Sequence, residues 1–417
     1  MGRSKSSKAK CVNGQEMIVG IDVAKHQHVA RILFPDGSES QPFGFSNHRK
    51  GFETFLAWLS FNQKRAKCDS IIVGLESTGH YWEPLAFFLE EIPGIRVVQV
   101  SPKHVKKTKE VYDNSPGKTD RKDAGVIAML IQMGRFQKLV LPKGPFAELR
   151  GYARLRERKI VELGVQRNLL HSLVDWVFPE YGSLFPKLEG KTSLTILKHY
   201  TTPEQILRAG FNRLSKAIHQ ASHGRLSEAC AERLMEAASA TIGLQEGIEA
   251  AAFAIRNIVA SVERIQEEIA TIEKELARVL DQIPYASQLF SIPGVGKITV
   301  AVILGEAGDL RRYHKAQELI KLAGLNLFEI SSGSHQGRRH ISKRGRPLLR
   351  KCLFFAALRT VKTGGAFREI YGRWTQRNQM QKTKALVGIS RKLLSLLFAL
   401  ARDNAAYHSP RVELRAA

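Results

Sequence analysis

The sequence has few cysteines and no long apolar run. Four of its 417 residues are cysteine, and Cys11, Cys68, Cys230 and Cys352 lie far apart without a CxxC pair. This argues against a disulfide framework or a zinc knuckle and favours free thiols in a reducing compartment. No stretch is long and apolar enough to span a bilayer, and the basic, polar residues 1–10 lack the apolar core of a signal peptide. We therefore expect a cytoplasmic protein without a membrane partner.

Acidic residues are also scarce. The chain has 64 Lys and Arg against 39 Asp and Glu, a formal net charge of +25. Between Glu329 and Asp403 the one acid is Glu369, amid a dense run of Lys and Arg. Such a surplus favours DNA or RNA as a partner, because binding releases counterions from the phosphate backbone. The length and the 43% hydrophobic content allow two or three domains with their own cores.

Hydrophobic patterning predicts alternating strands and helices in the first third of the chain. In order, the predicted elements are strands at 17–23, 29–34 and 41–45, a helix at 51–61, a strand at 71–75, a helix at 82–89 and a strand at 95–100. Three strands followed by helix, strand, helix and strand is the order of RNase H-like folds such as RuvC. Periodicity alone supports an α/β domain, and the narrower name depends on the carboxylates.

Four carboxylates stand at the ends of these predicted elements. Asp22 ends the first strand, Glu76 ends the fourth, and Asp120 and Asp123 share one face at the start of a later helix. Phosphoryl transfer with two metals needs several hard oxygen ligands around ions about 3.5–4 Å apart. Each acid alone could cap a turn or a helix, but the ordered set of four predicts a site for one or two magnesium ions.

Short strings around these acids carry a family resemblance. Residues 21–25 (IDVAK), 76–84 (ESTGHYWEP) and 118–124 (KTDRKDA) resemble the acidic blocks of the DEDD insertion-sequence transposases. That family comprises serine recombinases guided by a bridge RNA and the related Piv-type DNA invertases. Residues 291–296 (SIPGVG), 323–325 (AGL), 332–334 (SGS) and 341–345 (ISKRG) are similar to its second conserved domain. The motifs span residues 17 to 360 in matching order.

The resemblance implies a RuvC-like N-terminal domain that binds magnesium and a C-terminal transposase domain that supplies a nucleophilic serine. The acids carried over are Asp22, Glu76, Asp120 and Asp123. The serine carried over is Ser332, directly before Gly333, with Ser331 and Ser334 as open alternatives. The resemblance also implies assembly into dimers or tetramers, and a structured noncoding bridge RNA that pairs with donor and target DNA.

A serine suits this chemistry on independent grounds. A recombinase must keep the energy of the phosphodiester bond so that strands can be rejoined, and a phosphoserine intermediate does so. Serine needs activation, and cations must neutralise the phosphate. Read without the resemblance, the serine cluster is more typical of a flexible polar turn, and the basic run is more typical of a solvated or phosphate-holding face. The expected nucleic-acid contacts are Lys103, Lys106, Lys107, Lys118, Arg121, Lys297, Arg338, Arg339, Lys343, Arg344 and Arg346.

A heptad pattern marks the middle of the chain. The a positions are Ile248, Ile255, Val262, Ile269, Leu276 and Ile283, and the d positions are Ala251, Ile258, Ile265, Ile272 and Val279. The pattern predicts a coiled coil, with residues 146–177 of the same chain or another subunit as the partner. The expected organisation is a flexible basic N-terminus (1–15), a RuvC-like domain (16–145), a coiled coil (146–284) with a helical insertion (about 181–240), a mainly α transposase domain (285–405) and a tail (406–417).

Two further motifs fall in the C-terminal part. Residues 293–297 (PGVGK) are similar to a helix-hairpin-helix turn, whose backbone N–H groups can hold a phosphate, and a tight glycine turn between packed helices is an equal alternative. Phe367, Tyr371 and Trp374 lie among arginines, a mixture suited to stacking on bases. The helical patterns at 348–358 and 386–400 are more typical of core.

The sequence as a whole predicts a magnesium-dependent transposase or recombinase that cuts and rejoins DNA through a 5′-phosphoserine intermediate, guided by a bridge RNA. A RuvC-type junction nuclease that uses water as its nucleophile is one alternative. A site-specific invertase without an RNA guide is another, and a non-catalytic nucleic-acid scaffold is a third.

Overall fold

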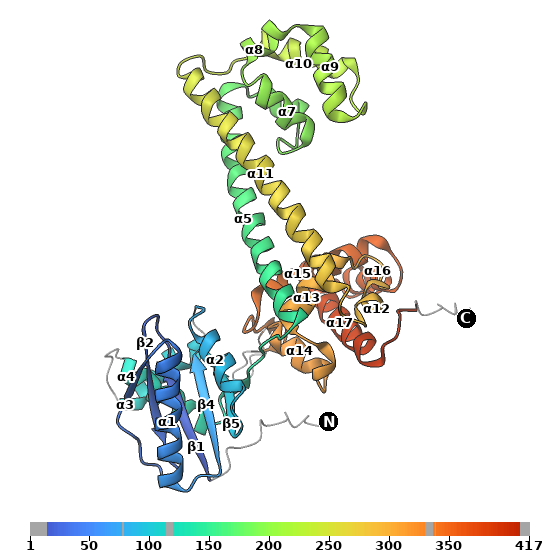
Figure 1. Cartoon of the computed structure of the whole chain (residues 1–417). Coiled ribbons are helices and arrows are strands. Elements are labelled where there is room, and N and C mark those ends of the chain that lie inside the picture. Colours follow the sequence, from blue (N-terminus) through green and yellow to red (C-terminus); the bar gives the residue numbers. More distant parts are fainter. Residues whose placement is uncertain (1–14, 77–78, 114–119, 330–336, 338, 409–417) are drawn as a thin grey trace, which may run out of the picture. The chain divides into compact units, whose positions relative to one another are not determined.

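The computed structural model describes residues 15–76, 79–113, 120–329, 337 and 339–408. The chain divides into two compact units, Met1–Leu141 and Pro142–Ala417 (Figure 1). Among the described residues, no helix combines the length and the apolar character that a bilayer crossing requires.

The first unit is an α/β domain built on a six-stranded sheet. Its elements are β1 (Glu16–Asp22), β2 (Gln27–Leu33), β3 (Phe43–Ser46), α1 (Arg49–Ala66), β4 (Ser70–Glu76), α2 (Trp82–Glu90), β5 (Ile95–Val100), α3 (Pro102–Asp113), α4 (Asp120–Gln132) and β6 (Phe136–Lys138). The strand order is β3-β2-β1-β4-β5-β6. The first three strands form an antiparallel meander, whereas β4 and β5 continue parallel to β1. The predicted strands and helices are confirmed to within a few residues, except at the C-terminal end of α1, and the order is consistent with an RNase H-like domain.

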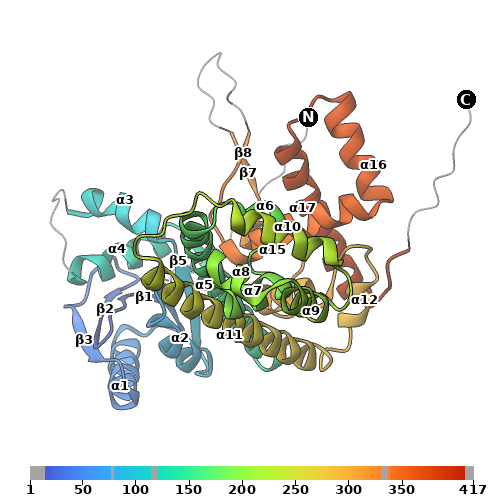
Figure 2. The same cartoon turned by 90° about the horizontal axis from the view of Figure 1, so that it is seen from above.

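Alternation along β1 explains how the sheet is covered on both faces. Met17, Val19 and Ile21 join a core with the aromatic residues of β3 and α1, and Ile18 joins a second core with α3 and α4. Successive side chains of a strand point to opposite faces, so β1 is buried on both. Helices α1 and α2 therefore cover one face of the sheet, and α3 and α4 the other (Figures 1 and 2).

The second unit begins with two long helices, α5 (Pro145–Val177) and α11 (Ile248–Leu280), which lie side by side (Figure 1). Arg156 of α5 pairs with Glu273 of α11 at 2.6 Å, and Lys159 pairs with Glu268 at 2.6 Å. Later residues of α5 thus meet earlier residues of α11, so the two helices are antiparallel. The heptad residues of α11 are buried, apart from Ile248 and Ile258, which are partly buried, and the last heptad position, Ile283, lies beyond the end of the helix. Helix α5 packs along α11, and it is one of the two partners that the sequence left open.

Short helices connect the C-terminal end of α5 to the N-terminal end of α11 and form a core of their own. They are α6 (Tyr181–Leu184), α7 (Lys191–His199), α8 (Pro203–Ala209), α9 (Phe211–Ser222) and α10 (Glu228–Ser239). The hydroxyl of the buried Tyr181 donates to the Ser193 carbonyl at 3.1 Å.

The C-terminal part is mainly helical and packs against the N-terminal end of α5 and the C-terminal end of α11. Its elements are α12 (Ala286–Phe290), α13 (Lys297–Ala307), η1 (Leu310–Arg312), α14 (Ala316–Leu322), β7 (Leu327–Phe328), β8 (His340–Ile341), α15 (Pro347–Thr363), α16 (Ala366–Gly372), the π-helical η2 (Arg373–Arg377) and α17 (Lys382–Asp403). Helices α13, α15 and α17 supply most of its core. For α15 and α17 the apolar spacing of residues 348–358 and 386–400 predicts this role.

Candidate active site and nucleic-acid surface

Asp22 and Glu76 lie at the ends of neighbouring strands. β1 and β4 are parallel, with Gly20 paired to Gly74 and Ile21 to Leu75, so the two acids follow at the same edge of the sheet. Adjacent strands lie about 4.8 Å apart, and both side chains are partly exposed. The edge therefore presents two carboxylates side by side, as the sequence predicts.

The third acid, Asp123, comes from the first turn of α4. Its side chain is buried, and its Oδ2 accepts an ion pair from Lys109 of α3 at 2.5 Å. Its Oδ1 is also buried, and within the described part of the chain it has no hydrogen-bond partner. Asp120 begins α4 one turn earlier, and its side chain lies outside the described residues.

Two glycines allow α4 to approach the strands that carry the other acids. A Cβ atom on Gly20 would lie 2.1 Å from the Ala124 carbonyl oxygen and 2.5 Å from the Ala128 nitrogen. On Gly74 it would lie 2.2 Å from Cδ1 of Ile131. The backbone of α4 next to Asp123 thus crosses β1 two residues before Asp22, which is about 7 Å along a strand.

These positions suit a divalent metal in the type of their donors. Carboxylate oxygens are the hard ligands that magnesium prefers. Oδ1 of Asp123 is a buried acceptor without a described hydrogen-bond partner, and a bound cation would offset the cost of burying it. The described side chains contain no group of three His, Cys, Asp or Glu that is already gathered to hold an ion. Asp123 meets Lys109 instead.

Lys109 is a site residue that sequence reasoning missed. The basic residues expected to contact nucleic acid on α3 were Lys103, Lys106 and Lys107, and all three are exposed. Lys109 lies one turn after the buried Val105, on the side of α3 that faces α4. Helical periodicity from Val105 could have found it, because residues i and i+4 share a face.

The expected nucleophile Ser332, with Ser331 and Ser334, lies outside the described residues, in the segment that connects β7 to β8. The base of this hairpin is described (Figure 2). The Ser342 N–H donates to the Asn326 carbonyl at 2.9 Å, and the two side chains hydrogen-bond at 2.5 Å. The chain therefore enters and leaves the serine segment at a fixed pair of strands.

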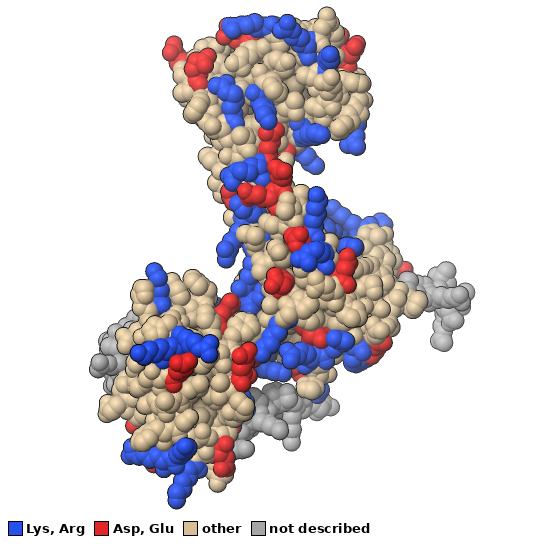
Figure 3. Space-filling view, in the orientation of Figure 1, with Lys and Arg blue, Asp and Glu red and all other residues tan. Residues whose placement is uncertain are grey.

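The other predicted nucleic-acid contacts differ in how available their charge is. Lys343 and Arg344 are exposed, whereas Arg346 is 15% exposed, donates to the Glu306 carbonyl and has its Nε 3.9 Å from the buried Glu306 carboxylate. Arg339 pairs with Glu329 at 3.0 Å and Lys297 lies 3.8 Å from Asp281, both at exposed positions. The side chains outside the described residues are those of Lys118, Arg121 and Arg338. In Figure 3 Lys and Arg are spread over the visible face, with acids between them along the helical pair.

The turn before α13 has a packing role. Gly294 has φ +87°, and a Cβ atom there would lie 2.9 Å from the Thr360 backbone nitrogen. Glycine is thus required both by the left-handed conformation and by the close approach of α15. This observation supports the tight turn that the sequence allowed as one of two interpretations.

Comparisons with known proteins agree with this combination of an acidic sheet edge and a basic helical unit. Residues 19–179 match the model of the DEDD transposases of IS110, described as a transposase, and residues 286–372 match that of the IS116/IS110/IS902 transposase family. The chain is a transposase, an enzyme that cuts and rejoins DNA. It belongs to the IS110 family.

Three relatives, two of them matched over nearly their whole length, support this assignment. The chain is 24% identical to an uncharacterized 43.6 kDa protein of insertion element IS110 from Streptomyces coelicolor, over 94% of this chain and 96% of the relative. It is 26% identical to a 44.8 kDa protein of element IS116 from Streptomyces clavuligerus, over 92% and 94%. A pilin gene-inverting protein of Moraxella bovis is 34% identical over 28% of this chain and 37% of the relative. Family membership implies DNA as the substrate and a divalent metal, typically magnesium.

Proposed function

We propose that this transposase cuts and rejoins DNA through a covalent phosphoserine on Ser332, at a site that includes magnesium bound by Asp22, Glu76, Asp120 and Asp123. The observation that supports this most strongly is the convergence of three acid-bearing elements. β1 and β4 end side by side with Asp22 and Glu76, and Gly20 lets α4 cross directly over β1.

The proposed chemistry conserves the phosphodiester bond energy. Oγ of Ser332 attacks the phosphorus, an O–P bond to the serine forms, and the bond to the 3′ oxygen breaks, so that a 3′-hydroxyl leaves. A 3′-hydroxyl of another strand then attacks the phosphoserine, restores a phosphodiester and releases the serine. Bound magnesium would polarise the phosphate and stabilise the attacking and leaving oxygens. Asp22, Glu76, Asp120 and Asp123 would hold the ions, and the exposed Lys343 and Arg344 would neutralise the backbone near the serine.

The exposed Lys103, Lys106 and Lys107 of α3 add a basic surface within the unit that carries the acids. Together with Lys118, Arg121, Lys297, Arg338, Arg339 and Arg346 they are the proposed nucleic-acid contacts. Backbone contacts of this kind position DNA but carry no sequence information. We propose that a bridge RNA provides the sequence specificity by pairing with donor and target DNA.

Self-association is the remaining part of the proposal. The outer side of α5 exposes Val161, Val165, Leu169 and Trp176, and their exposed fractions are between 48% and 58%. The spacing of four, four and seven residues places them on one stripe of the helix. An apolar stripe on a long helix supports a coiled-coil contact between copies, in a dimer or tetramer. The acids and Ser332 of one active site would then come from two subunits.

A mixing experiment tests this arrangement. Asp22→Ala and Ser332→Ala proteins are each expected to lose recombination of a reporter element, because each lacks one half of every site. Co-expressed, they are expected to regain part of it if acids and serine come from different subunits. The matched control is Ser331→Ala, which should keep activity alone. Activity of Ser332→Ala by itself would move the nucleophile to another group.

Inversion of a DNA segment is a second candidate outcome of the same chemistry, because the pilin gene-inverting proteins of Moraxella are relatives. The two functions differ in the arrangement of their substrates. Recombination of sites in inverted orientation on one molecule, without any RNA, would favour the invertase.

A further inference from the structure

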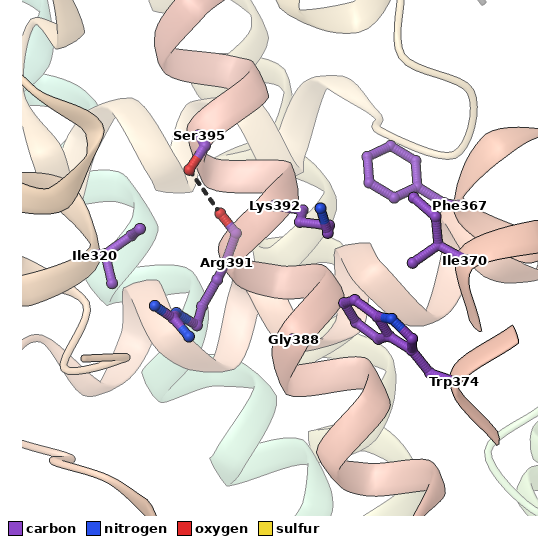
Figure 4. A pocket seen from close by; sticks show the side chains of 8 residues that line it. All are labelled: Ile320, Phe367, Ile370, Trp374, Gly388, Arg391, Lys392 and Ser395. Atoms are coloured by element: carbon purple, nitrogen blue, oxygen red, sulfur yellow. Dashed lines mark hydrogen bonds between the residues drawn. The ribbon is translucent and has the colours of Figure 1, made fainter. Parts of the chain in front are cut away.

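A groove of about 630 Å³ crosses α17 in the C-terminal unit. Its floor is the α17 face with Gly388, Arg391, Lys392 and Ser395 (Figure 4). Ile320 of α14 lies on one side, and Phe367, Ile370 and Trp374 of α16 and η2 lie on the other. Its volume is within the ~300–1,000 Å³ of small-ligand sites.

The aromatic wall of the groove is held at a fixed place. A Cβ atom on Gly388 would lie 2.6 Å from Cζ3 of Trp374, so the indole rests directly on the α17 backbone. Trp374 belongs to the π-helical turn η2, a rare conformation that often occurs at functional sites. Nζ of Lys392 lies 5.9 Å from the centre of the indole ring. The indole ring of Trp374 is thus held in a defined position next to the ammonium group of Lys392.

Within the described ranges, no ion pair joins the cationic side chains of the groove to an acid. Nε of Arg391 is buried, and among the described residues it has no hydrogen-bond partner. The described residues that line this groove include no carboxylate. A second groove, between α5, α11, α13 and α15, differs in this respect, because its Arg156 pairs with Glu273 and its Lys351 with Glu157. The α17 groove therefore favours an anionic ligand.

We infer that the α17 groove binds one unpaired nucleotide of a DNA or RNA strand. The base stacks on the partly exposed Trp374, and a backbone phosphate meets Arg391 and Lys392. This inference rests on the proposed function only in that the protein handles nucleic acid. It adds a binding site to the machinery that cuts and rejoins strands.

Both halves of the groove are needed to select this ligand. A bare anion would gain nothing from an aromatic wall, and an apolar peptide would leave the buried Nε of Arg391 without an acceptor. In a duplex the bases are stacked on one another and cannot lie against Trp374. Stacking on an aromatic side chain combined with cationic backbone contacts is how single strands are bound without sequence preference.

The test measures binding of short oligothymidylate and oligouridylate to the full-length protein, by quenching of tryptophan fluorescence and by anisotropy of a labelled strand. We expect saturable quenching that is lost in Trp374→Phe, a variant that keeps an aromatic ring at this position. Trp374→Ala is expected to bind about tenfold more weakly. A blunt DNA duplex should bind without the quenching. The two oligonucleotides show whether DNA or RNA is the preferred source of the nucleotide.

Matched variants separate the groove from general basic charge. Arg391→Met and Lys392→Ala are expected to weaken binding about tenfold. Arg373→Met and Lys384→Ala remove the same charges from exposed positions that do not line the groove and should change binding by less than threefold. Equal losses in both pairs, or quenching that persists in Trp374→Phe, would overturn the inference.

The outcome is independent of the proposed chemistry. Asp22→Ala and Ser332→Ala proteins should bind the oligonucleotides as the unmodified protein does. Normal binding without any covalent intermediate would leave the groove in place and reject the phosphoserine. If recombination proceeds through a phosphoserine and the groove variants bind normally, the phosphoserine is supported and the nucleotide site in the groove is rejected.

Discussion

Replacing Gly20 by alanine tests how α4 brings Asp123 to the other acids. The new Cβ atom would lie 2.1 Å from the Ala124 carbonyl oxygen, whereas ordinary van der Waals contact begins at 3.4 Å. The backbone of β1 fixes the position of the Cβ atom, and the carbonyl oxygen belongs to the backbone of α4, so neither atom can rotate away. We expect α4 to move away from β1 by about 1 Å, the shift that restores contact.

The size of the effect follows from this displacement. Overpacking of a buried contact costs about 1–3 kcal/mol, which lowers the melting temperature by roughly 3–10 °C in a domain of this size. A misplacement of about 1 Å at a catalytic group costs roughly 100-fold in rate. We therefore expect Gly20→Ala to fold and to lose about 99% of its recombination activity at a temperature where it remains folded.

Two other glycines provide the controls. Gly74→Ala meets side-chain atoms of Ile131 and Ile127, which can adjust in part, so its loss should be smaller. Gly151→Ala on α5 has nothing within 4 Å and should keep full activity with equal or higher stability. The measurements are recombination of a reporter element in cells and thermal unfolding of the purified proteins. Full activity and an unchanged melting temperature in Gly20→Ala would refute the positioning argument.

Two further predictions concern the same domain. Lys109→Met leaves the buried Asp123 carboxylate without its partner, which should lower the free energy of unfolding by about 3 kcal/mol. Magnesium should raise the melting temperature of this variant more than that of the unmodified protein. Equal shifts in the two proteins would mean that the ion binds elsewhere. Burial lowers the pKa of His28, so the folded state favours the neutral ring. The contribution of this ring to stability is full above the pKa of the unfolded state, about 6.5, and it falls as the pH is lowered below that value. The urea midpoint should therefore drop less between about pH 7.5 and 5.5 in His28→Leu than in the unmodified protein, and an equal drop would assign the acid sensitivity to other groups.

The sequence predicts the strands of the first domain well because each is a short apolar run that ends at a turn or a carboxylate. Asp22 and Glu76 are located by the same signal, since residues at the ends of neighbouring parallel strands meet at one edge. The partner of the heptad helix was open from sequence, because an apolar seam fits any helix with a matching face. The structure pairs it with α5.

Features that depend on contacts between distant segments could not be read from the sequence. β6 has three residues, too few for a period-2 pattern, and pairs with the edge of β5. The pairing of Lys109 with Asp123 depends on how α3 packs on α4. Arg346 has the same local pattern as its exposed neighbours and is nevertheless paired with Glu306, forty residues earlier. Gly388 becomes meaningful only because Trp374 lies against it.

The most direct test of the phosphoserine is to trap the intermediate. The protein is incubated with magnesium and a DNA substrate carrying the ends of its element, nicked so that the leaving strand diffuses away, and is then digested and analysed by mass spectrometry. We expect a nucleotide adduct on Ser332 that requires magnesium and is absent from Ser332→Ala and Asp22→Ala. Hydrolysed DNA without any protein adduct would contradict it and identify water as the nucleophile.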